Sequence, residues 1–191
     1  MSQISVIDLE QQLTLRINNE LSKQLDDIIE KMQAIAKKFD IKQVKERSPI
    51  KNVLTTATDP TSSLEVIKNF IRYQASRKDA SQIWKLEINE NQQKERFPNA
   101  VIKQIDDLTI NINNIFKSIN MSIDKELKPF LSEDGKNSMN PNLSQNQREK
   151  LEALKLYIEN NKSLLAKSIH LKLAQLYLGY LSREHTALIG S

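Results

Sequence analysis

The side chains best suited to binding chemistry lie between Ser62 and Trp84, where apolar periodicity, basic charge and aromatic rings coincide. Proline at position 60 ends whatever precedes this stretch, and Ser62 stands three residues before Glu65, a helix capping pattern. A helix therefore follows. Spacings of three and four residues place one apolar set on a single face: Leu64, Ile67, Phe70, Ile71 and Ala75.

The other side of this helix carries Lys68, Arg72, Tyr73 and Arg77. Lys68 and Arg72 are four residues apart, as are Tyr73 and Arg77, so each pair stacks along the helix surface. Guanidinium groups bind phosphate through fixed donors, and a phenol ring offers a face for a base. We predict that these four residues bind nucleic acid. The alternative is a polar face that carries Lys and Arg only for solubility.

Signatures of catalysis are missing from the sequence. The chain has no cysteine, and its two histidines, His170 and His185, are fifteen residues apart without a further ligand in range. Three glycines cannot build a phosphate-binding loop, and no nucleophile elbow is present. We therefore expect no catalytic residues, no metal ligands and no cofactor, and an enzyme is the least favoured class.

Composition predicts the fold class. The chain has 191 residues, of which 39% are hydrophobic and 27% charged, and it contains only three glycines and five prolines. So few turn-forming residues argue against a β-rich protein, whereas abundant Leu, Ile, Lys, Gln, Asn and Glu suit long helices. We predict an all-α bundle of four to five helices. The net charge of +4 is a mild basic excess, compatible with nucleic acid but not diagnostic.

The predicted organisation has three parts. Residues 1–47 form a long N-terminal helix, over about 7–45, with a heptad-like seam from Leu21 onward. Residues 48–61, rich in Pro and Thr, form a linker that is a poor helix, and residues 62–191 form the bundle core, with a loop at 129–143. The core is expected around 101–119 and 164–181, and residues 78–97 suit a short strand as well as a helical turn.

Location is constrained only weakly. The absence of cysteine fits a reducing cytoplasm, and the N-terminal residues resemble no signal peptide. No stretch approaches the roughly 20 apolar residues that a membrane span needs, so no membrane partner is expected.

The run I-K-N-F-I-R-Y-Q-x-S-R at residues 67–77, followed by Trp84 and by L-A-Q-L-Y-L-G-Y-L-S-R-E near the C-terminus, resembles a known family. It is similar to the small α-helical subunit of type III CRISPR effector complexes, over about residues 61–128 and 164–185. The resemblance implies a non-catalytic protein of antiviral defence that packs side by side with other subunits and with its own copies. Its basic face would contact guide or target RNA through Arg72, Tyr73 and Arg77, whereas Lys68 is added from helix geometry alone.

A rival class remains open beside this resemblance. Apolar seams on several helices also suit a helical adaptor or a secretion chaperone, which would bind a protein partner without nucleic acid.

Overall fold

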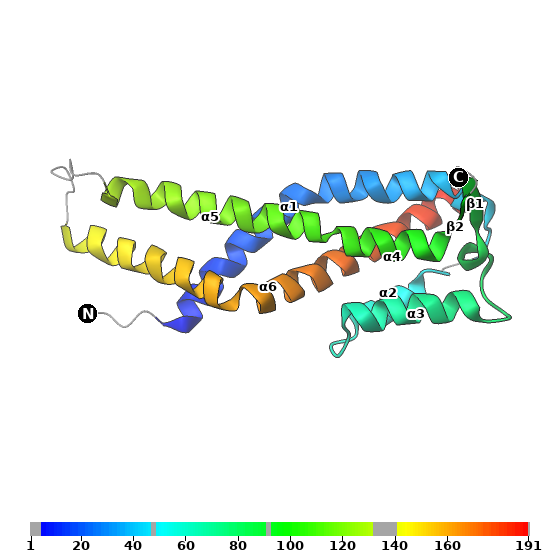
Figure 1. Ribbon diagram of the computed structural model, residues 1–191, viewed down its shortest axis with the longest axis horizontal. Helices are drawn as coiled ribbons and strands as arrows, with labels where there is room; N and C mark the ends of the chain where they lie inside the picture. Colours follow the sequence, from blue (N-terminus) through cyan, green and yellow to red (C-terminus); the bar gives the residue numbers. More distant parts are fainter. Residues whose placement is uncertain (1–4, 47–48, 91–92, 132–140, 191) are drawn as a thin grey trace. The chain divides into compact units, whose positions relative to one another are not determined.

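The computed structural model describes residues 5–46, 49–90, 93–131 and 141–190 (Figure 1). The all-α prediction is confirmed, with one small hairpin added to the helices. The predicted count of four to five helices is approximate. A short helix, α2 (Lys51–Thr58), was not expected, and Leu108 separates α4 (Phe97–Asp107) from α5 (Thr109–Leu131).

The chain divides into two compact units. The first is made of residues 1–24 and 111–167, and the second of residues 25–110 and 168–191. Two long helices, α1 (Val6–Lys38) and α6 (Pro141–Gly190), contribute residues to both units.

The core of the first unit is made by side chains of α1, α5 and α6. Spacings of three and four residues along α5 bring its apolar side chains onto one stripe. The buried apolar side chains that the three helices contribute to this core are Leu9, Leu13, Leu21, Ile112, Ile115, Phe116, Ile119, Ile123, Leu127, Leu154 and Ile158.

The second unit contains the rest of α1 and α6, together with α2, α3 (Leu64–Ser76) and α4. An aromatic cluster lies in its core: the ring of Phe97 is 5.5 Å from that of Phe39 and 5.8 Å from that of Trp84. Trp84 is fully buried, so the only tryptophan of the chain is a core anchor and not a surface for base stacking.

Residues 78–97, ambiguous in sequence, contain a 3₁₀ turn, η2 (Gln82–Lys85), and a hairpin. Strand β1 (Glu87–Glu90) pairs antiparallel with β2 (Gln93–Arg96), and the register places Glu87 opposite Arg96. Of this ambiguous segment, residues 82–85 therefore form a helical turn and residues 87–90 a strand.

Three boundaries differ from the prediction. Helix α1 ends at Lys38, not near residue 45, because Asp40 adopts the left-handed conformation with φ of 42° and a 3₁₀ turn, η1 (Ile41–Gln43), follows. The segment 48–61 is not a poor helix throughout, since α2 occupies its centre. The expected loop at 129–143 is helical at both of its ends, because α5 continues to Leu131 and α6 begins at Pro141. Residues 132–140 lie outside the described chain.

The stripe of α5 gives a matched pair of substitutions. Ile112 is buried, whereas Ile110, on the same helix, is exposed. Ile112→Asp places an unpaired carboxylate in the core, and we expect a loss of about 3 kcal/mol or more in the free energy of unfolding. Ile110→Asp should change it by less than about 0.5 kcal/mol. Urea denaturation followed by circular dichroism measures both. Equal stability of the two variants would show that the buried face is wrongly assigned.

Candidate interaction surface

Helix α3 positions all four of the predicted nucleic-acid-binding residues. The helix begins after Ser63, not Ser62: the Ser63 hydroxyl accepts a hydrogen bond from the amide of Val66 at 3.3 Å. Ile67, Ile71 and Gln74 are buried where α3 packs against α2 and α4 (Figure 1). The opposite side of the helix faces outward, and it is this outer face that could meet a ligand.

Lys68 does not lie open on that face. Its side chain is only 13% exposed, and its Nζ lies 2.5 Å from Glu65 Oε1 and 3.0 Å from Asp106 Oδ1 on α4. Hydrogen bonds to Glu65 first, and to Asp106 second, raise the pKa of Lys68. The ammonium group is thus compensated by two carboxylates, and it ties α3 to α4.

Arg77, the C-cap residue that follows α3, also has its charge compensated. Its guanidinium forms a two-pronged contact with the Asp79 carboxylate, and its Cζ lies 5.9 Å from the centre of the Tyr73 ring. The ion pair raises the pKa of Arg77 and lowers that of Asp79. One face of the Tyr73 ring is therefore taken up by a cation that already has its counterion.

Arg72 and Tyr73 are the two predicted residues that lie open. Tyr73 is 54% exposed. Arg72 is exposed too, and within the described chain it makes no ion pair or hydrogen bond. Only one of the three predicted cations is consequently available to a phosphate without first breaking an existing pair.

A shallow groove on the outer face includes residues that the sequence argument did not select. Its lining is Val66, Asn69, Phe70, Arg72, Tyr73 and Ser76. Phe70, expected on the buried side, lies half-buried at the edge, with its ring 5.9 Å from that of Tyr73. The sequence does hold a signal for this second apolar line, because Val66 and Tyr73 are seven residues apart and so fall on one side of a helix.

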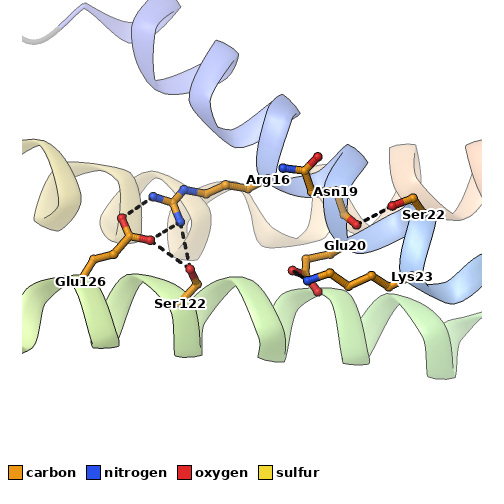
Figure 2. A network of polar contacts seen from close by, with 7 residues as sticks. All are labelled: Arg16, Asn19, Glu20, Ser22, Lys23, Ser122 and Glu126. Atoms are coloured by element: carbon orange, nitrogen blue, oxygen red, sulfur yellow. Dashed lines mark hydrogen bonds and ion pairs between the residues drawn. The ribbon is translucent and has the colours of Figure 1, made fainter.

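A polar network in the first unit is the other candidate (Figure 2). Arg16 of α1 donates two hydrogen bonds of 2.7 Å to the Glu126 carboxylate of α5. The Ser122 hydroxyl accepts a third hydrogen bond from Arg16 at 3.3 Å and donates one to Glu126 at 3.0 Å. A small polar pocket adjoins these groups, and Lys23 beside it is paired with Glu20. Every charge named here has its partner, so the network acts as a structural clamp between two helices.

The described residues also bear on metal binding and on membrane insertion. Among the described side chains, no cluster of His, Cys, Asp and Glu is placed to hold a metal ion. Within the described ranges, no helix has the length and apolar character of a membrane span.

Comparisons with models of known families, with curated proteins and with solved structures each returned no match to this chain.

The clamp predicts a pH-dependent contribution to stability. Hydrogen bonds from Arg16 lower the pKa of Glu126 in the folded state. The contribution is therefore fully present above the unfolded carboxyl pKa of roughly 4.3, and it is lost as the pH falls through the lower folded pKa. Because the Glu126 side chain is 42% exposed, we expect Glu126→Gln to cost only about 0.5–1 kcal/mol at pH 7. That cost should shrink toward zero in strong acid.

Urea denaturation of both proteins over a pH series measures this difference. Glu30→Gln is the matched control, because the Glu30 side chain is exposed and makes no hydrogen bond or ion pair within the described chain. A cost of Glu126→Gln that is the same at all pH values would refute the ionic origin of the clamp.

Proposed function

We propose that this protein is a non-catalytic helical adaptor that binds a protein partner through the outer face of α3. The observation that carries the proposal is a line of exposed or half-buried apolar side chains, Val66, Phe70 and Tyr73, on a helix whose other face is already packed. These side chains line the groove together with the polar Asn69 and Ser76.

The composition of this face supports a protein partner. Aromatic residues and arginine are enriched at the centres of protein interfaces, where rigid rings bury much area at a small cost in conformational entropy. Phe70 and Tyr73 supply the rings, and Arg72 stands beside them. The ion pairs of Lys68 and Arg77 with nearby carboxylates also favour a protein partner. They neutralise most of the positive charge that binding to a phosphate backbone needs.

A second candidate function is favoured by a different observation. Arg72 is open and Tyr73 carries a stacked guanidinium, which is the combination that binds single-stranded RNA. In this candidate the protein is a non-catalytic cytoplasmic subunit of a type III CRISPR effector complex. It would bind guide or target RNA weakly through α3 and pack side by side with other subunits. Phosphates would have to displace Glu65, Asp79 or Asp106 to recruit the remaining cations.

Co-purification from the source cells, with and without ribonuclease treatment, tests the proposed function. We expect the tagged wild-type protein to retain a stoichiometric protein partner after ribonuclease treatment, and the variant Tyr73→Asp to lose it. Leu164→Asp is the matched control, because Leu164 is an exposed leucine in the first unit, on α6. Unchanged circular dichroism shows that both variants fold. Retention of the partner by Tyr73→Asp would refute the proposal.

A titration of labelled single-stranded RNA decides about the second candidate. If α3 binds RNA, Arg72→Glu with Arg77→Glu weakens binding, and each lost phosphate contact flattens the log–log salt dependence by about 0.7. We expect instead that the double variant and the wild type bind RNA equally over the salt series. A clear loss would make RNA the ligand of this face.

A further inference from the structure

The outer face of α3 has the spacing of a helix-packing seam. Val66, Asn69, Tyr73 and Ser76 follow one another at intervals of three, four and three residues. At about 100° per residue, these positions form one line along the helix. The buried face of α3 uses Ile67, Ile71 and Gln74 instead, so the seam is not occupied by the chain's own core.

Two opposite charges flank the seam on the same side. Glu65 and Arg72 are seven residues apart, so they project in nearly the same direction, one near the start of α3 and the other near its end. The Glu65 side chain is 76% exposed, and Lys68 engages its Oε1. A carboxylate can accept several hydrogen bonds, so a second cation can still bind Glu65.

The order of charges along α3, acidic Glu65 and then basic Arg72, is complementary to the same order on a second helix that runs in the opposite direction. Against a second α3 running antiparallel, Glu65 faces Arg72 of the partner subunit, and the same pair forms again on the other side of the two-fold axis. The axis passes near Asn69, which lies about midway between Glu65 and Arg72 along the helix. A parallel copy would place Glu65 against Glu65 and Arg72 against Arg72, which like-charge repulsion disfavours.

We propose that the outer face of α3 binds the same face of a second copy of this chain, antiparallel, about a two-fold axis near Asn69. The inference rests on the proposed function and names the partner. A helix of 13 residues is about 20 Å long, so the contact is smaller than the roughly 800 Å² per partner of standard interfaces. The dimer is therefore weak. It also closes on itself, in contrast to an open side-by-side array.

Charge reversal tests the pairing. Sedimentation velocity of the full chain, treated with ribonuclease and run from low micromolar to near-millimolar concentration, should show a reversible dimer. Glu65→Arg and Arg72→Glu should each raise its Kd about tenfold or more, because both symmetric pairs become repulsive. The double variant should dimerise again, and so should an equimolar mixture of the two single variants, because their flanking charges are then opposite.

Cross-linking tests the axis independently. The chain contains no cysteine, so Asn69→Cys introduces a single thiol at the proposed axis. We expect it to form an intermolecular disulfide under mild oxidation, since bridged Cα atoms must come within about 7 Å. Lys103→Cys, at an exposed position of α4, is the control and should stay monomeric.

The outcomes separate this inference from the proposed function. A wild-type protein that stays monomeric, or a dimer whose Kd ignores the charge reversals, overturns the second copy as the partner. The proposed function then still stands if Tyr73→Asp loses a different protein in the co-purification. A dimer that disappears on ribonuclease treatment is bridged by nucleic acid, and that result also overturns the inference.

Discussion

Burial of one apolar stripe along α4 and α5 is the constraint on which both units depend. Its members keep alternating spacings of four and three residues across the turn at Leu108, and all of them are buried: Val101, Ile105, Leu108, Ile112, Ile115 and Ile119. The chain has no cysteine. Folding therefore depends on removing such side chains from water, at about 1.5–3 kcal/mol for each large aliphatic group.

The position of α3 follows from this packing. Once α4 is fixed by its buried side, the exposed carboxylate of Asp106 stands within 3.0 Å of Lys68 on α3. In this orientation of the helix, Ile67 and Ile71 are buried and the line from Val66 to Tyr73 remains outside. Lys68, which is predicted to bind nucleic acid, thus also joins α3 to α4 through an ion pair.

The sequence was sufficient for the features that depend on regular apolar spacing. The all-α class and the buried stripe from Val101 to Ile119 follow from periodicity, and both are confirmed. Helix α2 was missed because threonines and flanking prolines lower helix propensity locally. Its buried residues Val53 and Ala57, four apart, supply tertiary packing that overrides this weak preference.

The end of α1 was missed for a similar reason. Apolar residues continue beyond it, at Ile41 and Val44, and they are buried there without extending the helix. Burial of a side chain does not require the helical conformation, so a continued apolar pattern overestimates the length of a helix. His185 is buried, and its Nε2 lies 3.0 Å from the Val44 carbonyl oxygen, a contact that the sequence separation of 141 residues hides.

The candidate site shows which electrostatic contacts a sequence can reveal. Arg77 and Asp79 are two residues apart, so their pairing was readable without a structure. The Lys68–Asp106 pair joins residues 38 apart, and only the packing of α3 on α4 brings them together. Counting basic residues on a helix face therefore overestimates the charge that remains for a ligand.

Both candidate functions require Arg72 as a binding residue. An open guanidinium beside exposed rings suits a phosphate, and it equally suits a carboxylate of another protein copy. Its fork of donors lies against one planar anion at a time, so RNA and Glu65 of the partner subunit would compete for it. The neighbouring charges decide between the two ligands. The carboxylates of Glu65, Asp79 and Asp106 repel a polyanion such as RNA. They do not repel a second α3 helix, because it carries the same mixture of positive and negative charges.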